Sequence, residues 1–214
     1  MHPEDAIVDL LGVLAYGELC AFDRLADDAR MAPNLTARAA MSEMAALEFT
    51  HYQQLADRLG KLGADPAEAM SPFVAALETF HSLTEPQTWL EAVVKAYVGD
   101  GMAADFYREV ATLVDPETGE LINLVLNDAG RAEFAVSEVG AATAEQPSVS
   151  GRLALWARRL VGEAISQTQH VLADRDSLMM LMVRGGGDLA GVAALLTRIT
   201  DRHEERMAEL GLDS

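Results

Sequence analysis

The sequence predicts an all-α protein, and three observations support this fold class. The stretches between prolines are rich in Ala, Leu, Met, Glu and Arg, which favour helices. Apolar residues recur at spacings of three and four, as in Ile7, Leu10, Leu11 and Leu14. The chain contains no alternating strand pattern with hairpin signals. Because 50% of the 214 residues are hydrophobic, a sizeable core and a folded chain are expected.

The positions of Pro and Gly divide the chain into helices. Long helices are predicted for residues 4–30, 35–62, 87–114, 117–144, 148–182 and 188–210. A loop at 63–72 leads into a short helical segment near 73–83. The connection of about 25 residues between the second and third long helices is too long for a simple up-down bundle. It therefore predicts a four-helix bundle with a long crossover between helices 2 and 3, followed by two additional C-terminal helices.

A single domain over residues 1–214 is expected at this length, with a core bundle at about 4–146 and a C-terminal helical extension at about 147–212. The net charge differs between these parts. Residues 1–146 hold 25 acids and 8 bases, whereas the remainder holds 9 acids and 8 arginines. The whole chain carries a net charge of −18, which excludes a nucleic-acid binder that works through a generally basic surface.

Other features exclude further classes of protein. The single cysteine, Cys20, excludes an internal disulfide framework and a cysteine-based zinc site. No apolar run is long enough for a transmembrane helix. The N-terminus carries acids where a signal peptide needs positive charge. A cytoplasmic protein without membrane association is therefore expected.

An internal repeat places acids at matching depths in two pairs of helices. The segment YGE at 16–18 corresponds to VGD at 98–100, and a second acid with a partner three residues later follows in each half. The repeat equates Glu18 with Asp100, Glu48 with Asp128, and His51 with Arg131.

The spacing within this repeat has a chemical meaning. Glu48 and His51 are three residues apart and therefore share one helix face, where Glu18 from the antiparallel neighbour can meet them. Carboxylates with one imidazole form a mixed oxygen and nitrogen site that suits iron or manganese. Di-iron bundles use one Glu from each of two helices and Glu-x-x-His from the other two. The first half of that pattern is complete, and the second half is altered.

On these residues the chain resembles the ferritin-like superfamily. Within it, the chain is most similar to the tRNA hydroxylases that act on the isopentenyl group of a modified adenosine, and to their bacterial relatives. The resemblance spans residues 5–210 and rests on YGEL at 16–19, EFTH at 48–51, YVGDGMAADFYRE at 97–109 and the acid at 128. It implies an oxygen-activating dinuclear iron centre in the bundle core. The implied ligands are Glu18, Glu48, His51, Asp100 and Asp128.

The family's sixth ligand corresponds to position 131, where this chain has Arg131. A guanidinium stays protonated and offers no lone pair to a metal, but it pairs well with carboxylates such as the two aspartates of the second half. Arg131 can therefore stand where the second metal's charge would be. The alternatives are that Arg131 points outward, or that His170 supplies a nitrogen. Among the other histidines, we assign His81 to a loop and His203 to a solvated last helical turn.

The leading functional hypothesis is an oxygen-dependent non-haem iron hydroxylase with one or two iron ions, manganese being the alternative metal. Its substrate would be a small molecule or a modified nucleoside, and tRNA is disfavoured by the charge. An electron-transfer partner would supply reductant, because no flavin or nicotinamide motif is present. The alternative hypothesis is a metal-poor ferritin-like scaffold or binding protein without catalytic activity. A homodimer is the default expectation for assembly.

Overall fold

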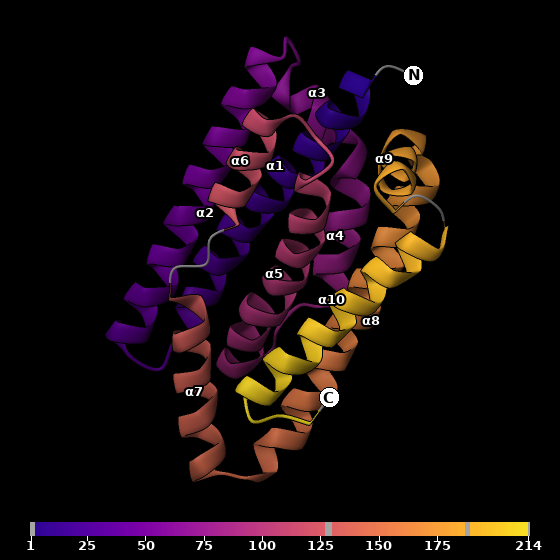
Figure 1. Cartoon of the computed structure of the whole chain (residues 1–214). Helices are drawn as coiled ribbons and strands as arrows, with labels where there is room; N and C mark the ends of the chain where they lie inside the picture. Colours follow the sequence, from indigo (N-terminus) through magenta and orange to yellow (C-terminus); the bar gives the residue numbers. More distant parts are fainter. Residues whose placement is uncertain (1–2, 127–129, 187–188, 214) are drawn as a thin grey trace.

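The structure, a computed structural model, describes residues 3–126, 130–186 and 189–213. Within these residues the chain forms helices and no strand, which confirms the all-α prediction. Figure 1 shows long helices packed side by side, with α5 between the α1–α2 pair and the C-terminal helices α8 and α10. In the described part of the chain, no helix combines the length and hydropathy needed to cross a bilayer.

The helices begin and end close to the predicted positions over much of the chain. In order they are α1 (Pro3–Asp28), α2 (Leu35–Lys61), α3 (Pro66–Met70), α4 (Val74–Leu83), α5 (Trp89–Ala111), α6 (Pro116–Val125), α7 (Arg131–Glu145), α8 (Ser148–Asp174), α9 (Asp176–Gly186) and α10 (Leu189–Glu209). Short 3-10 helices at Ala29–Met31 and Ser71–Phe73 complete the described elements.

Side-chain caps explain where several of these helices begin. Each capping side chain accepts a hydrogen bond from a backbone N–H of the first turn, which would otherwise lack a partner. The caps are Asn34 for α2, Asp65 for α3, Thr88 for α5 and Asp115 for α6.

The crossover between α2 and α5 is occupied by α3 and α4, as the long connection predicted. Its end is held against α5 by the buried side chain of Lys95, whose Nζ donates to the carbonyl oxygen of Thr84 at 2.7 Å. The same Nζ lies 5.5 Å from the centre of the Phe80 ring, within the range of a cation–π contact. These contacts place α4 beside the bundle core.

The prediction of one continuous helix over 117–144 was wrong. Helix α6 ends at Val125, and α7 begins at Arg131 after Gly130, whose φ of 91° lies in the left-handed region that favours glycine. Residues 127–129, which include the predicted ligand Asp128, lie outside the described residues. The break matters for function, because it places Arg131 in the first turn of a new helix.

The helix predicted over 148–182 is also divided. Helices α8 and α9 meet at Arg175, whose ψ of 85° departs from helical geometry. Gly185 and Gly186 belong to the end of α9, and Gly187 lies outside the described residues.

The core joins the C-terminal helices to the bundle. One buried apolar cluster combines Val93 and Val94 of α5 and Leu153 of α8 with Met207 of α10. A second cluster combines α1, α2, α6 and α9. The residues after 147 therefore pack against α5 as part of the same interior.

Candidate metal centre

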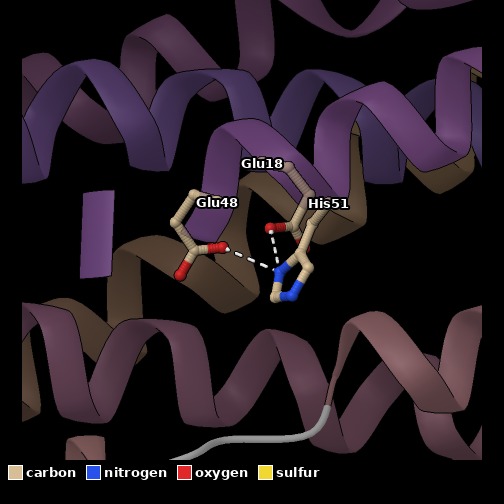
Figure 2. Close-up of side chains that lie close together, drawn as sticks. All are labelled: Glu18, Glu48 and His51. Atoms are coloured by element: carbon tan, nitrogen blue, oxygen red, sulfur yellow. Dashed lines mark ion pairs between the residues drawn. The ribbon is translucent and has the colours of Figure 1, made fainter. Parts of the chain in front are cut away.

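Three predicted site residues converge in the bundle interior. Figure 2 shows Glu18 from α1 facing Glu48 and His51 from α2. His51 Nδ1 lies 3.4 Å from Glu18 Oε2 and 3.4 Å from Glu48 Oε2. Each residue offers one ligand atom, and these atoms all lie within 4.8 Å of one another. The prediction that these three residues meet is confirmed.

The local sequence explains how α2 buries two polar side chains. The buried positions of this helix recur every three or four residues and form one stripe: Ala37, Met41, Ala45, Glu48, His51, Leu55 and Leu59. Glu48 and His51 therefore occupy two successive core positions of an otherwise apolar face. Burying ionisable side chains costs free energy unless they have partners. Two such residues at core positions are therefore typical of a functional site.

The geometry of the three residues fits one cation. Glu18 Oε2 and His51 Nδ1 are buried and have no hydrogen-bond partner. Two ligand atoms held about 2.1 Å from one ion lie roughly 3.0–3.4 Å apart, which matches the two separations of 3.4 Å from His51 Nδ1 to the glutamates. Carboxylate oxygens with an imidazole nitrogen suit iron, manganese and zinc, and do not select one of these metals by themselves.

The three side chains also perturb one another's protonation. Burial, followed by the contact with Glu48, raises the pKa of Glu18 well above its usual range. Burial opposes the charge of His51, but both carboxylates outweigh it and raise its pKa to about 9. Burial likewise opposes ionisation of Glu48, yet Glu18, His51 and the guanidinium of Arg131 lower its pKa to about 2. A cation would therefore compete with protons for Glu18 and His51.

Arg131 points into the site from the first turn of α7. Its side chain is only 13% exposed, so the alternative that Arg131 points outward is wrong. Its Nη1 donates to Asp100 Oδ2 at 2.7 Å, and its Nη2 donates to Glu48 Oε1. The two oxygens of Glu48 thus have different partners, because Oε2 faces His51 while Oε1 faces the guanidinium. His170 is exposed on α8, so its side chain does not reach the bundle interior.

The predicted ligand set is therefore divided. Glu18, Glu48 and His51 come together, whereas Asp100 lies beside Arg131 with its side chain 34% exposed. The described acids of the site and the one guanidinium sum to a formal charge of −2, from three carboxylates and one arginine. One divalent cation would neutralise that charge.

The site opens onto a cavity of about 390 Å³. Most of the cavity wall is apolar and comes from α1, α4, α5, α8 and α9, including Leu14, Leu77, Phe80, Phe106, Ile165, Leu172 and Leu181. His81 also lines it from α4, so the prediction of a loop residue was wrong. Burial, with the nearby charges of Lys95 and Arg24, lowers the pKa of His81 to about 3 and keeps its imidazole neutral.

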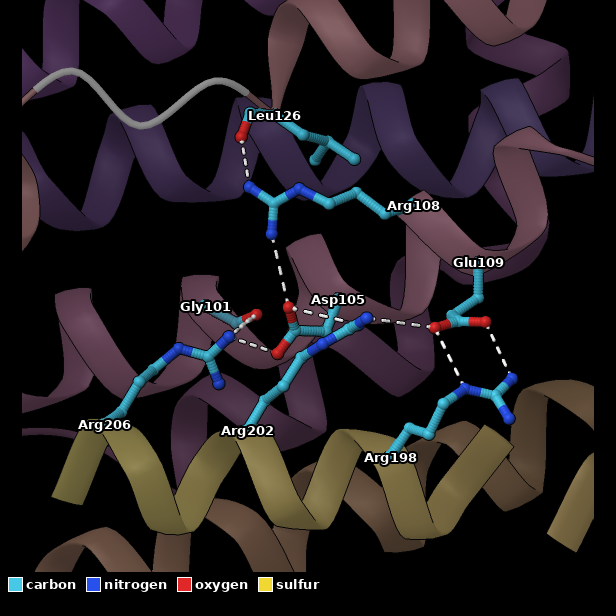
Figure 3. A network of polar contacts seen from close by, with 8 residues as sticks. All are labelled: Gly101, Asp105, Arg108, Glu109, Leu126, Arg198, Arg202 and Arg206. Atoms are coloured by element: carbon cyan, nitrogen blue, oxygen red, sulfur yellow. Dashed lines mark hydrogen bonds and ion pairs between the residues drawn. The ribbon is translucent and has the colours of Figure 1, made fainter. Parts of the chain in front are cut away.

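Sequence reasoning missed a second polar cluster, which we call the arginine cluster (Figure 3). It joins α5 to α10 and consists of Asp105, Arg108, Glu109, Arg198, Arg202 and Arg206. The signal was present, because its α10 members are spaced four residues apart and so are its acids. His203 lies in the same segment of α10 and is buried, so the prediction of a solvated turn was also wrong.

The fold and the site define a class of protein: a helical bundle with a carboxylate and histidine cluster in its core. A family model described as the ferritin-like domain of actinomycetes matches residues 2–185, and the chain belongs to this family. The match covers the three converging residues and ends before α10. No curated protein matches the chain. The ferritin-like prediction is confirmed, whereas the narrower resemblance to tRNA hydroxylases stays a prediction.

Proposed function

We propose that this protein is a ferritin-like non-haem iron protein that holds one Fe²⁺ and acts as an oxygen-dependent hydroxylase. The observation that carries the proposal is the convergence of Glu18, Glu48 and His51 on one point beside an apolar cavity, with two of their ligand atoms lacking hydrogen-bond partners. Bound iron would supply the capacity to reduce dioxygen. Manganese is the alternative metal for the same ligands.

Each nearby residue has a role in this proposal. Glu18, Glu48 and the Nδ1 of His51 hold the ion. Arg131 donates hydrogen bonds to Glu48 Oε1 and Asp100 Oδ2. A second ion would need these oxygens as ligands, so Arg131 limits the site to one ion. The apolar side chains of the cavity exclude water from the reacting atoms.

The overall reaction requires a reductant. Hydroxylation inserts one atom of dioxygen into a C–H bond and releases the other as water, which consumes two electrons and two protons. An electron-transfer partner would supply those electrons, because the chain has no flavin or nicotinamide motif. A small-molecule substrate fits an interior cavity. The net charge of −18 disfavours tRNA, which is a polyanion.

Metal content tests the proposal. Chelator-treated protein is reloaded with Fe²⁺ without oxygen, desalted, and analysed for metal per chain. We expect about one ion in the wild type, none in Glu48→Gln, and about two in Arg131→His, because the new imidazole can act as a ligand. Glu43→Gln is the matched control, since Glu43 is an exposed acid on the same helix. The reduced, loaded wild type should consume dioxygen, and failure to do so would contradict the hydroxylase assignment.

The ion pair between Arg131 and Glu48 also favours a second candidate function. If the guanidinium has replaced the catalytic metal altogether, the chain is a ferritin-like scaffold or binding protein. This candidate predicts that the wild type binds neither iron nor manganese, while Arg131→His does bind metal. The same titration therefore distinguishes the two functions.

A further inference from the structure

We propose that the cavity binds an amphipathic carboxylate, with the apolar chain inside the cavity and the head group on Arg206. This inference names the substrate class for the proposed metal centre and in that respect rests on it. The binding site itself is built from residues of α5, α8, α9 and α10 that are not among the proposed metal ligands.

The chamber for the chain lies where α5 meets α8, α9 and α10. Its apolar side chains form a distinct cluster that includes Met102, Phe106, Ala164, Leu172, Met182 and Ile199, all of which line the cavity. The cavity volume of about 390 Å³ falls within the range of small-molecule sites, roughly 300–1,000 Å³. An apolar chain would gain free energy by leaving water for this surface.

Arg206 supplies an unused donor at the wall of this cavity. Its side chain is 12% exposed, and its Nη2 donates to the carbonyl oxygen of Gly101 at 2.9 Å and to Asp105. Its Nη1 is buried and has no hydrogen-bond partner. Leaving a buried charged donor unpaired is costly, so this nitrogen is suited to an anionic ligand.

The guanidinium of Arg206 occupies the space that a side chain at residue 101 would fill. A Cβ at residue 101 would lie 2.4 Å from Arg206 Nε, so any side chain there would displace the arginine. The absence of a side chain lets the guanidinium lie against the backbone of α5. Arg206 is thereby fixed at Gly101, the residue that follows Asp100 in the sequence.

The head-group position and the chamber are adjacent. Ile199 precedes Arg206 by seven residues, which places both on one face of α10. Met102 directly follows Gly101 on α5, and both residues line the cavity. A ligand whose carboxylate binds Arg206 can therefore extend its chain along Met102 and Ile199.

The charge of the cavity favours an anion once a metal is bound. Among the described lining residues, Glu18, Glu48 and Asp100 are balanced by Arg108, Arg131 and Arg206. A divalent cation on the acids would leave the wall with net positive charge. This local balance contrasts with the net charge of −18 over the chain, and it explains how an acidic protein can accept an anionic ligand.

The test compares decanoate with decan-1-ol by isothermal titration calorimetry on the whole chain, both metal-free and iron-loaded. We expect decanoate to bind the wild type at least tenfold more tightly than the alcohol. Arg206→Gln should remove this preference while leaving the affinity for the alcohol unchanged. Arg198→Gln is the matched control, because Arg198 belongs to the same helix and the same cluster but pairs with Glu109 on an exposed face.

A second variant tests the chamber separately from the head group. Ala164→Phe should weaken the binding of both ligands at least tenfold, because the new ring fills the chamber that Ala164 lines. Equal affinity of the wild type for acid and alcohol, or no binding of either, would overturn the inference. If iron binds but decanoate does not, only the substrate class fails. If decanoate binds but iron does not, the metal centre fails and the ligand site stands.

Discussion

Two clusters of charged side chains involve α5, and their net formal charges have opposite signs. We call Glu18, Glu48, His51, Asp100 and Arg131 the acidic cluster, and Figure 2 shows the first three of these residues. The formal charge of this cluster with neutral imidazole is −2. The arginine cluster holds four arginines and two acids, which sum to +2 (Figure 3).

The carboxylate oxygens of the two clusters are also satisfied to different extents. Asp105 Oδ1 lies 3.2 Å from Arg108 and 3.6 Å from Arg202, and Asp105 Oδ2 pairs with Arg206. In contrast, Glu18 Oε2 has no hydrogen-bond partner, and the imidazole of His51 lies 3.4 Å from it. Asp105 is surrounded by guanidiniums and links α5 to α10. Glu18 lies in a cluster with excess negative charge, which favours the binding of a cation. The same residue type therefore has two roles, which depend on the charge around it.

The largest expected effect breaks the arginine cluster. Asp105→Asn should lower the free energy of unfolding by about 3–5 kcal/mol, because it leaves the buried guanidinium of Arg206 without its carboxylate. Urea denaturation measures the change. Glu109→Gln is the control and should cost less than about 1 kcal/mol, since the arginines that pair with Glu109 are more than a third exposed. A loss below 1 kcal/mol for Asp105→Asn would show that Asp105 is not essential to the packing of α10.

The corresponding change in the acidic cluster should affect metal binding and not stability. Burial and the contact with Glu48 raise the pKa of Glu18 well above its usual range, so the metal-free fold disfavours the ionised carboxylate. Glu18→Gln should therefore change the unfolding free energy of chelator-treated protein by less than about 1 kcal/mol. The same variant should lose at least about 100-fold in affinity for iron, measured by competition with a coloured chelator. Unchanged affinity for iron would remove Glu18 from the ligand set.

The pH dependence of metal affinity sharpens the contrast. The two carboxylates raise the pKa of His51 from 6.5 to about 9 despite burial, so this side chain is protonated at neutral pH when no ion is bound. Its protonated form stabilises metal-free protein below pH 6.5, and this contribution declines as the pH rises through 9. Affinity for iron or manganese should rise over the same interval, by about tenfold per pH unit for each proton displaced. Affinity that stays flat from pH 6.5 to 9 would contradict ligation by His51.

The smallest expected effect lies at the exposed end of the arginine cluster. Arg198 pairs with Glu109 at 2.7 Å, and its side chain is 48% exposed. Arg198→Gln should shift the melting temperature by less than about 2 °C, because solvent and salt screen exposed pairs. Differential scanning calorimetry at low and high salt measures this shift. A larger shift at both salt concentrations would mean that the whole cluster behaves as one buried unit.

Much of the candidate site could be predicted because its geometry is local. Glu48 and His51 share a face of α2 by their spacing, and Glu18 meets them because α1 and α2 are joined by a short turn at residues 29–34. The grouping of these three side chains needed no long-range information. Metal ligation by Asp100 and Asp128 rested on the family pattern, and it stays a prediction.

The residues that were missed depend on contacts between distant segments. Arg206 and Asp105 are separated by about a hundred residues, and only the packing of α10 on α5 brings them together. The same packing buries His203. The break between α6 and α7 escaped prediction although the sequence carries turn residues there, because Asn127, Asp128 and Gly130 lie between two segments of helical spacing.

The sequence by itself determined that the chain is helical, where the crossover lies, and that one helix pair carries two glutamates and a histidine on facing surfaces. These properties follow from periodicity, capping and i,i+3 spacing, which act within a few residues. Only the tertiary structure decided that Arg131 points inward, that Arg206 lines a cavity, and that one cluster is acidic while the other is basic. Such pairings arise when distant helices exclude water from one another, and no local pattern specifies which charges will then meet.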